Sequence, residues 1–168
     1  RVNFNVIGID GRPGVRSLRE MLSEWLTFRQ ETVLKRLQFR LDKILDRLHI
    51  LEGLMIAYLN VDEVIRIVRE EDRPKDALMA KFGISERQAD AILDIRLRQL
   101  ARLEEEKIRA EQNELNAERA DLERTINSKA RLRTLIKKEL RADAEEYGDD
   151  RLSEIVTRDE AQAFREKD

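Results

Sequence analysis

The residue types that carry out acid–base or metal chemistry are present in this sequence, but they do not form a recognisable site. The only histidine, His49, lies in an apolar helical segment, where a hydrogen-bonded structural histidine is a far better interpretation than a catalytic one. The motifs H-E-x-x-H and G-x-S-x-G are missing, and so is an EF-hand loop. Asp149 and Asp150 could hold a cation, but a solvated turn is the better interpretation.

Two further arrangements could support chemistry, and both lack a necessary residue. Tyr58 and Tyr147 could act as nucleophiles, but neither has a basic neighbour in sequence that would lower its pKa. The glycines of residues 8–14 suggest a phosphate-binding loop, yet the P-loop lysine is missing and no βαβ unit follows. Because the chain contains no cysteine, disulfides and Cys-ligated zinc are excluded. The sequence therefore predicts no catalytic residue and no metal site, and this segment is not an enzyme by itself.

The composition indicates long helices. Of the 168 residues, 40% are charged and 5% are aromatic, with 6 glycines and 2 prolines. Ala, Glu, Lys, Leu and Arg make up more than half of the chain, which is typical of coiled coils. We therefore expect an elongated all-α molecule rather than a sandwich, a barrel or a glycine-rich α/β fold. The apolar runs are too short for a transmembrane helix.

A long helix is predicted over residues 16–52. Ser17 and Glu20 form a capping box at its start, and no glycine or proline follows until Gly53. Apolar residues then recur at alternating spacings of three and four, as in a coiled-coil seam. The seam consists of Leu34, Leu37, Leu41, Ile44, Leu48, Leu51 and Met55. Such a helix would be about 54 Å long.

Residues 53–100 predict several short capped helices, which together form a small helical knob. Asn60 with Glu63, and Ser85 with Gln88, read as capping signals, while Pro74 begins a helix and Gly83 ends it. The helix after Ser85 is expected to bury Ala89, Ile92, Leu93 and Leu97, and to run on without a break through residues 101–141. The seam of this returning helix is Leu103, Ile108, Leu115, Leu122, Ile126, Leu132, Ile136 and Leu140.

The two long helices are predicted to pair as an antiparallel coiled-coil arm with the knob at its tip. Residues 29–47 carry a net charge of +3 and residues 104–123 a net charge of −5, so folding back at the knob brings opposite charges together. Two solvated faces with no relation to each other are the alternative. Residues 1–15 contain the only strand-like stretch, whose pairing partners are expected outside this sequence. Residues 142–168 are expected to be an acidic linker.

Several segments resemble type IIA bacterial topoisomerases, specifically their breakage-reunion subunit. The resemblance begins with residues 47–54 (R-L-H-I-L-E-G-L) and 60–65 (N-V-D-E-V-I) and continues at 82–85, 88–97, 139–140 and 147–151. Leu152 departs from the family, which usually has a second arginine there. Residues 71–79, 100–104 and 107–112 look more like the A subunit of topoisomerase IV than like that of gyrase, which is the alternative within the family.

The resemblance implies a mechanical role for the knob. Residues 1–15 would end a tower domain, and residues 53–100 would form a C-gate that dimerises with a second copy, through which the transported DNA duplex leaves. The candidates for the dimer contact are Ala91, Ile95 and Arg98, and the alternative is that they belong to the knob's own core. The family's nucleophilic tyrosine follows an arginine in a winged-helix domain. Tyr58 follows alanine and Tyr147 follows glutamate, so we expect the active site upstream of this segment and a C-terminal DNA-wrapping domain beyond the linker.

The resemblance also implies the partners of the parent enzyme, an ATP-hydrolysing isomerase active in decatenation, relaxation and chromosome segregation. Its expected partners are a second copy, the ATPase-bearing B subunit of the heterotetramer and double-stranded DNA. ATP and magnesium would be used through that ATPase partner, with no cofactor in this segment. Six bases could contact DNA phosphates, with a solvated helix end as the alternative: Lys129, Arg131, Arg133, Lys137, Lys138 and Arg141. The expected location is cytoplasmic and nucleoid-associated, with peripheral contact to the inner membrane left open. The alternative is a structural coiled-coil dimerisation module unrelated to DNA.

Overall fold

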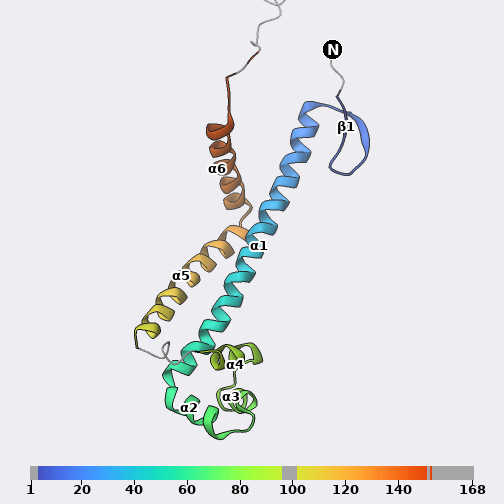
Figure 1. The fold of residues 1–168 in the computed structure, drawn as a ribbon. Helices are drawn as coiled ribbons and strands as arrows, with labels where there is room; N and C mark the ends of the chain where they lie inside the picture. The colour runs from blue at the N-terminus through green and yellow to red at the C-terminus, as the bar shows by residue number, and fades with distance from the viewer. Residues whose placement is uncertain (1–3, 96–101, 151, 153–168) are drawn as a thin grey trace, which may run out of the picture. The chain divides into compact units, whose positions relative to one another are not determined.

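The computed structural model describes residues 4–95, 102–150 and 152, and this part of the chain is helical apart from one short sheet. The all-α prediction is therefore confirmed. The described helices are α1 (Leu18–Leu59), α2 (Val61–Glu70), α3 (Pro74–Phe82), α4 (Glu86–Leu93), α5 (Arg102–Ile126) and α6 (Lys129–Tyr147) (Figure 1). The chain divides into two compact units, Arg1–Arg133 and Thr134–Asp168, with the boundary inside α6.

The strand-like stretch at the N-terminus forms a hairpin with its own neighbour. Strand β1 (Phe4–Ile7) pairs antiparallel with β2 (Pro13–Arg16), so that Phe4 lies opposite Arg16. In the connecting turn, Gly8 donates its N–H to the Arg12 carbonyl at 3.0 Å, and Gly11 has a φ of 75°. The prediction that the strand has no partner within this sequence was wrong, because the glycine-rich turn ends early enough to leave residues for β2.

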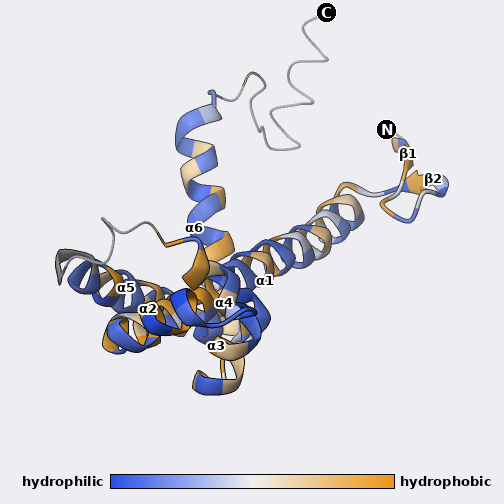
Figure 2. Ribbon diagram, turned by 60° about the horizontal axis from the view of Figure 1, so that its bottom comes forward, coloured by the Kyte–Doolittle hydropathy of each residue, from blue (hydrophilic) through white to orange (hydrophobic). Residues whose placement is uncertain are grey.

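Helix α1 begins as predicted and ends later than predicted. The Ser17 hydroxyl accepts a hydrogen bond from the Glu20 N–H at 3.3 Å, and the Glu20 carboxylate accepts the Ser17 N–H at 2.7 Å, which confirms the capping box. The predicted end at residue 52 was wrong, because the helix continues through Gly53 to Leu59. Its 42 residues span about 63 Å. Hydrophobic and hydrophilic residues are interspersed along this helix (Figure 2).

Helices α1 and α5 pack side by side in antiparallel directions, as predicted (Figure 1). The Arg40 guanidinium donates to both carboxylate oxygens of Glu118 at 2.7 and 2.9 Å. One heptad further along α1, Arg47 pairs with Glu111 at 2.7 and 3.0 Å. The partner number falls as the α1 number rises, so the helices run in opposite directions. Ile44, Leu48, Leu51 and Ile108 are the buried members of the predicted seam in this pair.

The returning helix is interrupted, contrary to prediction. Helix α4 ends at Leu93, and Leu97 lies outside the described residues. Helix α5 then ends at Ile126 and α6 begins at Lys129. Ser128 provides the new start, because its hydroxyl accepts the Arg131 N–H at 3.3 Å and its carbonyl accepts the Leu132 N–H at 2.9 Å. Helix α6 also extends to Tyr147, into the stretch expected to be a linker.

Helices α2, α3 and α4 surround the C-terminal end of α1 and form the predicted knob. Its core contains Ala57, Ile67, Leu78, Ile84, Ala89 and Ile92. Pro74 begins α3 and Gly83 ends it with a φ of 64°, as predicted. The prediction that Asn60 caps the next helix was wrong. The Asn60 amide donates to the Ile56 carbonyl at 2.8 Å, and its side chain makes no capping hydrogen bond to α2. Glu63 instead forms an ion pair with Lys81 of α3 at 3.3 Å.

Candidate functional site: the knob surface and its joint with the arm

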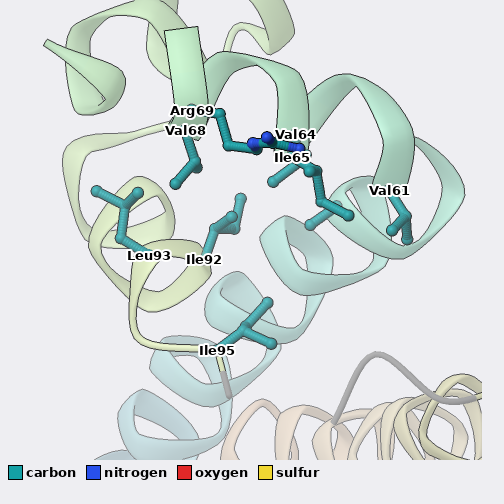
Figure 3. A pocket seen from close by; sticks show the side chains of 9 residues that line it. Val61, Val64, Ile65, Val68, Arg69, Ile92, Leu93 and Ile95 are labelled. Carbon is teal, nitrogen blue, oxygen red and sulfur yellow. The ribbon is translucent and has the colours of Figure 1, made fainter. Parts of the chain in front are cut away.

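The knob has an apolar pocket that opens to solvent (Figure 3). The pocket has a volume of about 220 Å³ and lies between α2 and the C-terminal half of α4. Apart from Arg69, its lining is entirely aliphatic: Ala57, Val61, Val64, Ile65, Val68, Ile92, Leu93 and Ile95. Aliphatic side chains that gather at one exposed hollow make this the candidate surface for a contact with another molecule.

The pocket is exposed because α2 carries two apolar rows. Ile67 points into the knob core and is buried. Val61, Ile65 and Val68, spaced by four and three residues, line the pocket on a second row. Val68 is 46% exposed and Ile65 is 37% exposed. The sequence marks these residues as apolar positions of a short helix, but it did not lead to the prediction that they line an exposed pocket.

The structure places the three residues predicted for the dimer contact in different situations. Ala91 is half-buried on α4. Ile95 is half-buried as well, packs against the knob core and also lines the pocket. Arg98 lies outside the described residues. The prediction of Leu93 as a core residue was wrong, because it is 36% exposed at the pocket. The role of Ala91, Ile95 and Arg98 in dimerisation stays a prediction.

A buried polar cluster joins the knob to the arm. Gln88 of α4 is only 6% exposed, and its amide N–H donates to the His49 carbonyl of α1 at 2.7 Å. The Gln88 amide oxygen accepts the Ser85 N–H at 2.9 Å, which confirms the predicted capping box of α4. The Ser85 hydroxyl lies 2.7 Å from His49 Nε2, so the histidine is hydrogen-bonded and structural, as expected.

Gly53 allows this close approach between α1 and α4. A Cβ atom added at Gly53 would lie 2.7 Å from Gln88 Cβ and 2.8 Å from Gln88 Cγ. Real Cβ atoms essentially never come that close to another carbon, so only glycine fits here without a shift of α4. The glycine in the middle of α1 is therefore explained by helix packing and does not mark a helix end.

Ion pairs surround the polar cluster. Arg87 of α4 lies 3.0 Å from Asp46 of α1, and its hydrogen bond and charge lower the pKa of the Asp46 carboxyl. Lys75 of α3 pairs with Asp90 at 2.8 Å and with Glu86 at 2.7 Å, and hydrogen bonds to these carboxylates raise the pKa of Lys75. These contacts link α4 to both of its neighbouring helices at the solvent-exposed edge.

The other residues considered for chemistry do not come together in the described part of the chain. No group of three or more histidine, aspartate or glutamate side chains there could hold a metal ion. Tyr147 is exposed, and a hydrogen bond with Glu146 raises the pKa of its phenol, which disfavours a phenolate nucleophile. The six bases predicted to contact DNA phosphates are all exposed on α6. Within the described ranges, no helix has the length and hydropathy needed to cross a membrane.

Comparison with known proteins defines the class. The family described as the A subunit of DNA gyrase/topoisomerase IV matches residues 1–141. The chain therefore belongs to this family of DNA gyrase and topoisomerase IV A subunits. This confirms the resemblance to breakage-reunion subunits, and it removes the alternative of a coiled-coil protein from an unrelated family.

Within this family, the chain is similar to A subunits of DNA topoisomerase 4. The chain is 59% identical over all 168 residues to the A subunit of DNA topoisomerase 4 from Salmonella typhimurium. It is 58% identical over the same length to that of Escherichia coli K12, and 60% identical over 166 residues to that of Pseudomonas aeruginosa. These names agree with the paralogue predicted from the sequence. The chain spans 22% of the length of each of these relatives.

Proposed function

We propose that this chain is the coiled-coil and C-gate segment of the A subunit of a topoisomerase IV. In that role, two copies meet through their knobs and form the exit gate for the transported duplex during ATP-dependent double-strand passage. Decatenation, relaxation and chromosome segregation would be the activities of the whole enzyme. The observation that supports this proposal is the solvent-exposed aliphatic pocket of the knob, carried at the end of a paired helix of about 63 Å.

The character of the pocket suits a contact that must open and close. A permanent homodimer normally buries a large apolar interface, whereas contacts that form transiently are smaller and have polar surroundings. Here the aliphatic lining is bordered by Arg69, and charged residues such as Arg66 and Glu63 lie on the same helix. The pocket would form the apolar centre of such a contact, with the charged residues around it as the rim.

The remaining partners follow from the same role. The ATPase partner of the heterotetramer would bring ATP and magnesium, and the nucleophilic tyrosine would come from a domain that precedes this segment. The exposed bases of α6 would contact phosphates of double-stranded DNA through charge alone, without reading its sequence. The protein would then work in the cytoplasm at the nucleoid, where peripheral contact of the parent enzyme with the inner membrane is also compatible with this role.

The oligomeric state of the isolated chain tests the proposal. We expect sedimentation equilibrium across the micromolar range to show a dimer that Val68→Glu and Ile95→Glu both shift toward monomer. Val15→Glu is the matched control, because Val15 is also an exposed valine but lies in the hairpin. A wild-type chain that stays monomeric at every concentration, or a Val68→Glu variant that dimerises like wild type, would refute the gate.

The contact with DNA is tested separately. We expect the isolated chain to bind duplex DNA weakly at physiological salt, with an affinity that falls steeply as salt increases. Reversing the charges of Lys137 and Lys138 should flatten this salt dependence. Tight binding that is insensitive to both changes would contradict a purely electrostatic contact.

A further inference from the structure

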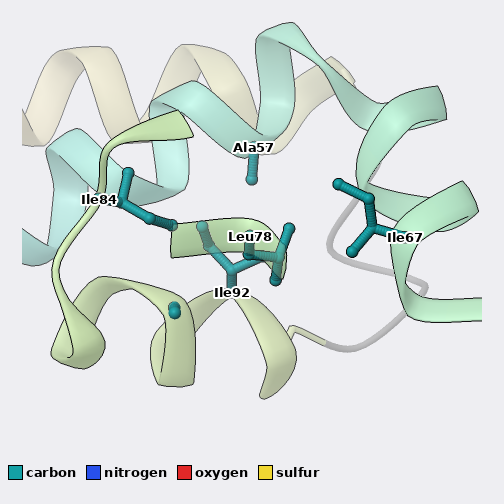
Figure 4. Packing of buried hydrophobic residues seen from close by; sticks show 6 residues of the cluster. Ala57, Ile67, Leu78, Ile84 and Ile92 are labelled. Atoms are coloured by element: carbon teal, nitrogen blue, oxygen red, sulfur yellow. The ribbon is translucent and has the colours of Figure 1, made fainter. Parts of the chain in front are cut away.

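Helix α4 has three faces, and each face contacts a different part of the protein. Gln88 and Arg87 contact α1 on the arm side. Ala89 and Ile92 are buried in the knob core, where Ile92 lies near Leu78 (Figure 4). Leu93 lies at the exposed pocket, opposite the aliphatic row of α2. A shift of α4 against α1 would therefore move Leu93 against that row, which consists of Val61, Ile65 and Val68.

We propose that Gln88 is a positioning residue: it fixes the knob on the arm at the orientation in which the gate surface can meet a second copy. This inference rests on the proposed function, since it concerns the same surface. Gln88 is the buried polar residue in the described core, and both ends of its amide are used, one on α1 and one on the cap of α4.

The geometry makes this joint directional. An aliphatic side chain at position 88 could pack against α1 in several orientations, because dispersion contacts have little directional preference. The amide at 2.7 Å from the His49 carbonyl and the His49–Ser85 hydrogen bond at 2.7 Å are directional, so they favour the observed orientation over the others. Gly53 makes this contact possible sterically, because Gln88 Cβ and Cγ occupy the space that a side chain at position 53 would take.

The experiment measures the orientation of the knob and the strength of the dimer in the same variants. Since the chain contains no cysteine, spin labels at Asp42→Cys on α1 and Ala80→Cys on α3 can report the arm-to-knob distance in labelled protein diluted with unlabelled protein. Gln88→Met keeps the side-chain length but removes both hydrogen bonds. Gln88→Glu keeps the oxygen that caps α4 and removes the donor to His49, so it tests the joint even if the methionine variant unfolds.

We expect both variants to broaden the distance distribution and to raise the dimer dissociation constant at least tenfold, with Gln38→Met on exposed α1 surface as the unaffected control. A variant that loses stability but keeps the wild-type distance would overturn the proposal, and so would a changed distance with an unchanged dissociation constant. A wild-type chain that never dimerises would refute the proposed function, whereas the distance measurement would still decide whether Gln88 holds the knob in place.

Discussion

Substituting alanine for Gly53 places a methyl group at the crossing of α1 and α4. The added Cβ would lie 2.7 Å from Gln88 Cβ, which is close to the backbone of α4 and cannot swing away as the end of a long side chain could. Helix α4 must therefore move outward, or Gln88 must leave its place against α1. Either response weakens the hydrogen bond of 2.7 Å from the Gln88 amide to the His49 carbonyl.

Two effects of opposite sign determine the result. Alanine is favoured over glycine in a helix interior by about 1 kcal/mol, which would stabilise α1. Overpacking a tight contact costs about 1–3 kcal/mol, and weakening a buried hydrogen bond costs about 1 kcal/mol more. We therefore expect Gly53→Ala to lower the free energy of unfolding by about 1–3 kcal/mol and the melting temperature by about 3–9 °C.

Urea unfolding followed by circular dichroism measures this change. Ala110→Gly on the exposed face of α5 is the control, because it reports helix propensity without any steric contact and should lower the free energy of unfolding by about 1 kcal/mol. The sign of the change in unfolding free energy shows whether α4 lies as close to α1 as the structure has it. If Gly53→Ala stabilises the protein by the propensity term alone, α4 does not approach α1 as described. In a Gln88→Gly background, which removes the obstructing atoms, Gly53→Ala should become stabilising.

Three further predictions follow from the contacts of the helices. Arg40→Glu should weaken the pairing of α1 with α5 and Glu118→Arg should restore it in the double variant, which a double-mutant cycle at low salt would detect as a favourable coupling. Ser128→Ala removes the cap of α6 and should cost about 0.5–2 kcal/mol, measured as lost helical signal and a lower urea midpoint; an unchanged midpoint would argue against the cap. Hydrogen bonds with basic partners lower the pKa values of Asp46 and Glu118 in the folded state. Their stabilising contribution is therefore complete above the pKa of the unfolded carboxyls and should be lost as pH falls below about 4, so urea midpoints that stay constant down to pH 3 would contradict these pairs.

Much of the arm could be predicted because its signals are periodic or local. The alternating spacing of Leu48 and Leu51 with their neighbours defines the buried side of α1, and the opposite charges of two distant segments indicate that they pair. Caps such as Ser17 depend on residues only three positions apart. These features survive in the structure because each acts within one helix or repeats along it.

The errors arise where a tertiary contact or a weak cap outweighs helix propensity. Gly53 has the sequence context of a helix end, yet it is a packing site for a helix that lies more than thirty residues later in the sequence. The break before α6 is hard to predict, because no glycine or proline lies near Ser128. Only the Ser128 hydroxyl, which caps α6, indicates that a new helix begins there. Leu93 neighbours the buried Ile92 in sequence, but adjacent helical residues point about 100° apart, so Leu93 lies at the pocket instead of in the core.

The register of the arm shows why the joint at the knob matters beyond the knob itself. The two arginines that pair with α5 are seven residues apart, and so are the acids at positions 104, 111 and 118. If α5 slipped by one heptad, Arg40 would meet Glu111 in place of Glu118, so the spacing of these charges does not by itself select the register. The apolar seam repeats at nearly the same period and cannot exclude the slip either. Only non-repeating contacts can select one register, and in the described part of the arm and knob the contact of Gln88 with Gly53 and His49 is of this kind. Because α4 is attached to α1 there, this contact fixes the position of α4 along α1 independently of the repeating charges.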